Sequence, residues 1–392
     1  MGLYPWGLYH WPLQSIQERI LQALHADTAW VQHLMNGLSD LNGTLVYLCV
    51  IATVLWTVNK QVGRVLGTVL VLSEGIGDTL KYLVHSNRPY FDQAFLNGLL
   101  HPALDAGHYA GGYSLPSGHS FNLATFWGTF ALYLCRKTWS IIGAIALILA
   151  VGLSRIALAA HWPLDVLSGW TFGALIVGGV WLIRRYRPDL PFTATTATLL
   201  AGLFVVIAAA TYLVEPVGRS SSLSLIESGR AKNNPPPYFV CTTSASQEKT
   251  ANPCAGASPV FISPDGAVRV PPEAAIHINA DGSLDRERYS TGIPYAWRMI
   301  ALGLGLLLGA FLEQKRVRFD PQVGDRKRQV LKLIIGLPML VCTWLVLSPA
   351  VFAPAGKYPV FPLLQSGAAA FVVSFALPWL FTNLWPDCRR GS

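Results

Sequence analysis

The stretch "SRIALAAHWPLD", Ser154–Asp165, separates two long apolar runs of the chain. These runs extend over about residues 139–158 and 164–183, and each is long enough to cross a bilayer as a helix. Charged side chains are costly next to hydrocarbon and usually have a function there. The sequence must therefore explain why an Arg, a His and an Asp lie where two membrane helices meet.

The composition of the chain is that of a membrane protein. Of its 392 residues, 52% are hydrophobic and only 13% are charged, whereas soluble domains have about 25% charged residues. Lipid permits only helices or closed barrels, and the apolar runs are too long for barrel strands. We therefore predict an all-α, polytopic transmembrane helical bundle of about nine spans, near residues 42–59, 63–84, 119–135, 139–158, 164–183, 195–215, 295–313, 331–351 and 363–382.

Polar and apolar segments divide the chain into four parts. We expect an N-terminal interfacial segment (1–41), a six-span core (42–215), an extracytoplasmic polar insert (216–294) and a C-terminal three-span extension (295–392). Apolar residues at helical spacing predict an amphipathic helix in the first part, lying either in the membrane interface or against the bundle: Leu13, Ile16, Ile20 and Leu24.

The insert of 79 residues is rich in Ser, Asn, Pro and Gly, which favour turns and extended chain over helix. A small loop domain is favoured over a flexible segment. Its two cysteines, Cys241 and Cys254, could form a disulfide in an oxidising compartment, but the sequence leaves their pairing open.

The distribution of basic residues predicts the orientation in the membrane. Cytoplasmic loops carry an excess of Lys and Arg. Sixteen of the 29 basic residues fall in one set of loops: Lys60, Arg64, Arg136, Lys137, Arg184, Arg185, Arg187, Lys315, Arg316, Arg318, Arg326, Lys327, Arg328, Lys332, Arg389 and Arg390. We therefore expect a cytoplasmic C-terminus, with the N-terminus and the insert outside. This excess also accounts for the net charge of +8 without a nucleic-acid partner.

Three polar stretches are expected to meet at the outer face. They are "KYLVHSNRP" with Lys81 and Arg88, "SLPSGHS" around Ser117, and the opening stretch. In a serpentine of antiparallel helices, all three fall at the same membrane surface. Arg offers phosphate a fork of donors and Lys adds a point charge, while a helix that begins near Ser117 presents free N–H groups to an anion. The arrangement predicts a phosphoryl site.

His161 and Asp165 are one helical turn apart, with Pro163 suited to the first position of the second helix. Asp165 can then accept a hydrogen bond from one nitrogen of His161, which leaves the other nitrogen as an oriented nucleophile. His119 remains as the proton donor to the leaving oxygen.

These stretches resemble the three signature motifs of the type 2 phosphatidic acid phosphatase superfamily, KxxxxxxRP, PSGH and SRxxxxxHxxxD, in the same order. Each motif alone is weak, but their order at facing helix ends is specific. The resemblance covers roughly residues 60–185, about a third of the chain. It implies a membrane phosphatase core and a site made of Lys81, Arg88, Arg155, Ser117, Gly118, His119, His161 and Asp165.

The resemblance also implies a role for each group. The three cations and the amides of Ser117 and Gly118 would hold the phosphoryl oxygens. His161 would attack to give a phosphohistidine, and His119 would protonate the leaving group and then activate water. Asp165 would orient His161. No metal or other cofactor is implied, because the cations neutralise the charge that Mg²⁺ neutralises elsewhere.

Each polar residue also has a simpler explanation by itself. Lys81 or Arg88 can be a cation that reaches toward the interface, Arg155 can pair with Asp165, and His119 can cap a helix. Glu74 and Asp78, which share a helix face with Lys81, can form a structural pair or help to place Lys81, and the structural role is favoured. The conjunction of the three stretches favours the phosphate site.

A phosphorylated membrane lipid is the favoured substrate, because a site at helix ends lets the tail remain in the bilayer. The alternative is a sugar phosphate, since the span count, "SRIALAAHWP" and "RPYF" are also similar to glucose-6-phosphatase. Asp165 and the 216–294 insert depart from that enzyme. A soluble haloperoxidase is disfavoured because the chain has about nine predicted membrane spans. A non-catalytic transporter or scaffold is disfavoured because it would not need two positioned histidines.

We predict that the protein lies in a bacterial inner membrane, although a protein of the endoplasmic reticulum membrane with a lumenal site would obey the same charge rule. The oligomeric state is left open.

Overall fold

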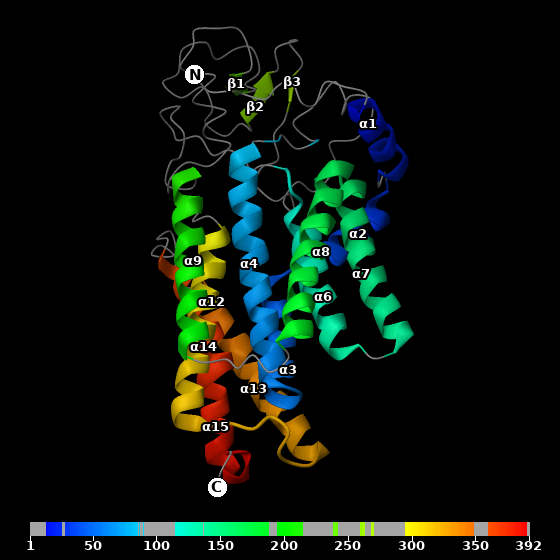
Figure 1. Ribbon diagram of the computed structural model, residues 1–392. Coiled ribbons are helices and arrows are strands. Elements are labelled where there is room, and N and C mark those ends of the chain that lie inside the picture. The colour runs from blue at the N-terminus through cyan, green and yellow to red at the C-terminus, as the bar shows by residue number, and fades with distance from the viewer. Residues whose placement is uncertain are drawn as a thin grey trace.

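The computed structural model of the protein describes residues 13–25, 28–84, 86, 89, 114–135, 137–187, 194–214, 238–241, 259–262, 268–269, 295–348 and 360–389 (Figure 1). The described chain is predominantly helical. Its helices are α1 (Leu13–Leu24), α2 (Ala29–Asp40), α3 (Thr44–Thr57), α4 (Lys60–Val84), α6 (Gly118–Leu134), α7 (Thr138–Ala157), α8 (Pro163–Tyr186), α9 (Ala194–Val214), α12 (Tyr295–Leu312), α13 (Arg326–Val346), α14 (Val360–Phe371) and α15 (Leu377–Leu384). Short π-helical segments, Glu313–Val317 and Val372–Ala376, follow α12 and α14, and a 3-10 turn, Pro386–Cys388, follows α15.

Each of the nine predicted runs contains a helix, but fewer helices have the length and composition of a span. Among the described residues there are five such helices, α7, α8, α12 with its π-helical end, α13, and α14 continued through α15. The pair α2 and α3, bent by 47°, would make a sixth. The other predicted spans depart from the pattern, because α6 has only 17 residues and α4 carries charged residues along its length. The chain is an integral membrane protein, and the count of nine spans stays a prediction.

Helix α4 lies between two groups of helices (Figure 1). On one side it packs against α6, which in turn packs against α7 and α8. On the other side it packs against α9 and α12, and α12 packs against α14. One large apolar core, which includes Tyr47, Leu66, Phe126, Phe204 and Phe319, is continuous through both groups. The last helices are therefore part of the same bundle as the first ones.

Glycine lets α6 and α8 approach each other closely at the end where α6 begins. A Cβ atom on Gly169 of α8 would lie 2.7 Å from the carbonyl oxygen of Ser117, and one on Gly173 would lie 2.5 Å from Cβ of Ala124. Small residues commonly allow such close approach between membrane helices. This contact holds the start of α6 against the start of α8.

Helix α1 packs against the bundle, which is one of the two arrangements that the sequence left open, and its placement in the membrane interface stays a prediction. Leu21 is fully buried against Ile156, Ala159 and Trp162 of the α7–α8 region. Three of the residues that suggested an apolar face, Ile16, Ile20 and Leu24, are exposed. The helix therefore packs against the bundle through Leu21 and carries exposed apolar side chains beside it.

The polar insert contains three short strands, in agreement with the turn and extended signals that its sequence shows. They are β1 (Tyr238–Cys241), β2 (Pro259–Ile262) and β3 (Val268–Arg269), and they pair antiparallel in that order. Tyr238 lies opposite Ile262, and Phe261 lies opposite Arg269. Cys254 is outside the described residues, so its pairing with Cys241 stays untested.

Candidate active site

The loop between α7 and α8 is folded tightly around His161. Ala159 has a positive φ of 50°, and the N–H groups of Ala160 and His161 both donate to the carbonyl oxygen of Arg155, at 3.0 and 3.2 Å. The N–H of Trp162 donates to Oδ2 of Asp165 at 2.8 Å, as in a capping box at the start of α8. The chain reversal thus buries His161, whose side chain is 1% exposed.

The carboxylate of Asp165 reaches His161 through a third residue. Nδ1 of His161 lies 3.6 Å from Oδ2 of Asp165, which is longer than a hydrogen bond. Ser114 lies beside both groups: its Oγ is 3.2 Å from Nδ1 of His161, and its hydroxyl donates to Oδ2 of Asp165. The direct hydrogen bond that the sequence suggested is replaced by this bridge. Sequence reasoning missed Ser114, whose only signal was its position two residues before "PSGH".

The start of α6 is bonded to the start of α8. Ser117 precedes the helix, and its N–H donates to the carbonyl oxygen of Asp165 at 2.9 Å. Asp165 therefore accepts the hydrogen bond of this amide in the structure, and the expected role of the amide in holding phosphate stays a prediction. Gly118 is the first residue of α6, where backbone N–H groups have no partner within the helix, and its expected role in holding phosphate also stays a prediction.

Lys81 extends from the last turn of α4 to the first residue of α6. A Cβ atom on Gly118 would lie 3.3 Å from Nζ of Lys81, so the missing side chain makes room for the ammonium group. Nζ also lies 3.1 Å from Oδ1 of Asp78. Two of the predicted stretches, from α4 and α6, therefore meet at this point.

The buried carboxylates of α4 have different partners. Glu74 accepts a hydrogen bond from Nδ2 of Asn122 on α6, and Ser73 donates to Oδ1 of the same Asn122 at 2.9 Å. Asp78 contacts Lys81 instead. Both roles that the sequence allowed are therefore present: Glu74 links two helices, and Asp78 holds the cation of the site.

Arg155 lies in the last turn of α7 and is 2% exposed. Its Nη1 donates to Oγ of Ser39 on α2 at 3.0 Å, and this oxygen lies 3.1 Å from Oγ of Ser154. On α1, Oε1 of Gln17 accepts a hydrogen bond from the N–H of Leu164 at 3.1 Å. The N-terminal helices thus support the site through Ser39 and Gln17, which sequence reasoning missed because neither belongs to a motif.

His119 and Arg88 are the remaining predicted site residues. His119 is the second residue of α6 and is partly exposed. Arg88 is outside the described residues, so its proposed role stays a prediction. Ser86, two residues earlier in the sequence, accepts a hydrogen bond at its carbonyl oxygen from the N–H of Ser114 at 2.8 Å.

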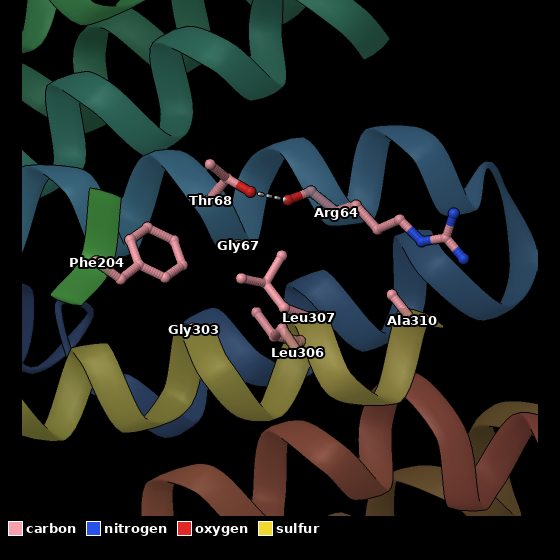
Figure 2. Close-up of a pocket in the computed structure, with 8 residues that line it drawn as sticks. All are labelled: Arg64, Gly67, Thr68, Phe204, Gly303, Leu306, Leu307 and Ala310. Carbon is pink, nitrogen blue, oxygen red and sulfur yellow. Dashed lines mark hydrogen bonds between the residues drawn. The ribbon is translucent and has the colours of Figure 1, made fainter. Parts of the chain in front are cut away.

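A small pocket, with a cavity volume of about 10 Å³, lies elsewhere, among α4, α9 and α12 (Figure 2). Its lining is mostly apolar and consists of Arg64, Gly67, Thr68, Phe204, Gly303, Leu306, Leu307 and Ala310. None of these is a predicted site residue, and Arg64 precedes Lys81 by 17 positions on α4, or about 25 Å. We therefore place the candidate active site at the helix ends and not in this pocket.

Comparison with known proteins finds two family matches. The PAP2 superfamily matches residues 63–189, and a second family, described as PAP2 superfamily phosphatase, transmembrane extension, matches residues 297–388. The first match contains all three predicted stretches. The second contains the last helices, whose role the sequence left open.

Similar individual proteins come from several organisms. An undecaprenyl-diphosphatase from Sulfolobus acidocaldarius is 34% identical over 156 residues, which are 36% of this chain and 69% of that protein. A lipid A 1-phosphatase from Rhizobium etli is 30% identical over 135 residues, 33% of this chain and 56% of that protein. A solved PAP2 type phosphatidylglycerolphosphate phosphatase from Bacillus subtilis is 26% identical, covering 46% of this chain and 92% of that chain, with a TM-score of 0.36.

Proposed function

This chain belongs to the PAP2 superfamily of integral membrane phosphatases, and we propose that it hydrolyses a lipid phosphomonoester or diphosphate through a phosphohistidine on His161. The hydrogen bond between the N–H of Ser117 and the carbonyl oxygen of Asp165 is the observation that carries this proposal. It joins the second stretch to the third, and the approach of Lys81 to Gly118 adds the first.

Substrate binding rests on the cations. Arg155 offers a planar fork of donors that suits phosphate oxygens, and Lys81 adds a compact positive charge at the start of α6. The N–H of Gly118 lies at a helix N-terminus, which favours an anion. Arg88 is expected to supply the third cation. Together these groups would offset the charge of the phosphoryl group in the transition state.

The reaction would take place in two transfers. In the first, a nitrogen lone pair of His161 attacks phosphorus, the bond from phosphorus to the lipid oxygen breaks, and His119 gives that oxygen a proton. In the second, His119 takes a proton from water as the water oxygen attacks phosphorus. The bond from phosphorus to nitrogen breaks, inorganic phosphate leaves, and His161 returns to its starting state. Neither transfer requires a metal ion.

A lipid substrate is supported by the relatives and by the surface around the site. The similar proteins are named for undecaprenyl diphosphate and lipid A. Helices α7 and α8, which flank the His161 loop, expose large apolar side chains: Ile142, Ile145, Leu149, Leu153, Leu167 and Leu175. A lipid tail could lie against such a surface while its phosphate enters between the helix ends. We infer that the site faces the extracytoplasmic side, because the basic loops are at the other end of α4.

The test is phosphate release by the purified protein in detergent. We expect turnover of a prenyl diphosphate or a lipid phosphomonoester, slow or absent turnover of glucose 6-phosphate, and no loss of activity in EDTA. The phosphohistidine intermediate should be detectable as an acid-labile phosphate bound to the protein. His161→Ala should abolish both turnover and this bound phosphate, whereas His33→Ala, at an exposed position on α2, should leave both unchanged. Normal turnover by His161→Ala would refute the proposed nucleophile, and a preference for glucose 6-phosphate would refute the lipid substrate.

A further inference from the structure

Ser114 is a fully buried residue whose hydroxyl has no part in the two transfers described above. It lies between the two groups on which the nucleophile depends, His161 and Asp165. We propose that Ser114 is a positioning residue that connects the Asp165 carboxylate to His161 and thereby selects the nitrogen that attacks phosphorus. This inference rests on the proposed function.

The distances favour a bridge over a direct pair. Oδ2 of Asp165 is 3.6 Å from Nδ1 of His161, whereas Oγ of Ser114 is 3.2 Å from the same nitrogen and donates its proton to the same carboxylate oxygen. A separation of 3.6 Å between nitrogen and oxygen is too long for a hydrogen bond. The carboxylate therefore acts on the imidazole through the serine hydroxyl.

The chemistry of the hydroxyl then fixes the proton on His161. A serine hydroxyl has one proton, and a hydrogen bond to a carboxylate is stronger than one to a neutral nitrogen. Ser114 therefore donates to Asp165 and accepts from the N–H at Nδ1 of His161. The lone pair is left on Nε2, which becomes the nucleophile. As Nε2 attacks, positive charge develops on the ring, and the bridge carries the stabilising effect of Asp165 to it.

Main-chain hydrogen bonds hold this arrangement in place. The N–H of Ser114 donates to the carbonyl oxygen of Ser86 at 2.8 Å, and Asp165 also accepts from the N–H groups of Trp162 and Ser117. These bonds use backbone donors, so replacing the Ser114 side chain leaves them intact. A variant at this position should therefore retain the fold and lose only the bridge.

Substitution of Ser114 tests the bridge. Partners that orient a metal-ligating histidine contribute about 10- to 100-fold, and by analogy we expect Ser114→Ala to lower kcat by that factor with KM within about threefold. A structural defect would not separate kcat from KM in this way. Ser374→Ala, which removes a buried hydroxyl that donates to the carbonyl oxygen of Ala370 in the extension, is the control and should keep the normal kcat.

A matched pair of variants separates the hydroxyl from the shape of the side chain. Thr and Val have nearly the same shape, but only Thr has a hydroxyl. Ser114→Thr should therefore retain much more activity than Ser114→Val, and this comparison also serves if Ser114→Ala fails to fold. Equal kcat values for the two variants, or a Ser114→Ala enzyme within twofold of the wild type, would overturn the inference.

A double-mutant cycle adds a second measurement. If Ser114 acts only by connecting Asp165 to His161, then Ser114→Ala should have little further effect in an Asp165→Asn background. Fully additive losses would show that Ser114 acts independently of the carboxylate and would refute the bridge. The wild-type activity separates the two proposals: an inactive wild type refutes the proposed function and the bridge together, whereas an active wild type with unaffected Ser114 variants refutes the bridge alone.

Discussion

The two ends of α4 gather charged side chains in contrasting ways. At one end, Lys60 and Arg64 bind Oε1 and Oε2 of Glu313, at 2.9 and 2.6 Å, and Glu313 also accepts the N–H of Phe319 at 2.7 Å. About 30 Å away, at the other end, Lys81 contacts Asp78 and Arg155 donates to the neutral hydroxyl of Ser39. At the first end, two cations share the carboxylate of Glu313, whereas at the second end Lys81 pairs with Asp78 and Arg155 also bonds to a serine hydroxyl.

Lys332 is another buried cation near the end of α4 that carries Lys60 and Arg64, and it too is surrounded by fixed polar groups. Lys332 of α13 is fully buried, and its ammonium group donates to the carbonyl oxygens of Pro321 and Val323 at 3.1 and 3.2 Å. It also lies 5.0 Å from the centre of the Phe319 ring. The comparison teaches that a buried charge in this protein is structural where several fixed groups surround it, and we propose that the cations at the other end of α4 bind phosphate instead.

The largest expected effect on stability is at Glu313. Glu313→Gln removes the carboxylate that Lys60 and Arg64 share, and breaking a buried ion pair typically costs about 3–5 kcal/mol. We expect the free energy of unfolding in detergent to fall by that amount, with kcat per folded molecule nearly unchanged. The neighbouring exposed Gln314→Ala is the control. Comparable stability of the two variants would contradict the structural role of this end.

Lys81 should show the opposite behaviour. Loss of one group that stabilises transition-state charge typically costs about 10²- to 10³-fold in rate. Lys81→Ala should therefore lower kcat/KM per folded molecule by that factor, and it should lower the melting temperature less than Glu313→Gln does, because only one ion pair, that with Asp78, is lost. Lys137→Ala, at an exposed position beside α7, should change neither quantity. If Lys81→Ala were as unstable as Glu313→Gln, the contrast between the two ends would fail.

Glycine substitutions in α8 test how the site is held together. Gly169→Ala brings a methyl group within 2.7 Å of the Ser117 carbonyl oxygen and must move α6 or α8. Overpacking of this kind costs about 1–3 kcal/mol, and we expect kcat/KM to fall as well, because the bond from Ser117 to Asp165 is disturbed. Gly179→Ala, on the same helix and with no atom within 4 Å of the new methyl group, should be neutral or slightly stabilising. If Gly169→Ala and Gly179→Ala had similar kcat/KM values, the close contact between α6 and α8 would not be needed for activity.

Ser39 should give the smallest effect. Its hydroxyl accepts a hydrogen bond from Arg155, and loss of one such bond is worth about 1 kcal/mol. We expect Ser39→Ala to raise KM about fivefold through a less ordered Arg155, with kcat nearly constant. Ser140→Ala, near the other end of α7, is the control. A purely kcat effect would show that Ser39 does more than hold the arginine.

The sequence located the helices and the family motifs because both depend on local pattern, whereas the roles of the motif residues stay predictions. Hydropathy located all nine helical runs, and the spacing of His161 and Asp165 placed them one turn apart with Pro163 at the first position of α8. The predicted family is confirmed. The supporting residues were not predictable in this way, since Ser39 and Glu313 are ordinary polar residues until another helix brings a partner to them.

By itself, the sequence determined that this is a helical membrane protein of the PAP2 superfamily, and it supplied the residues to which we assign its chemistry. Only the tertiary structure decided that Asp165 reaches His161 through Ser114, that the Ser117 amide is already bonded, and that α1 and α2 support the site. The physical reason is the range of each interaction. Helix periodicity and burial in lipid are set by neighbouring residues, whereas a hydrogen bond between helices depends on packing positions accurate to a fraction of an ångström.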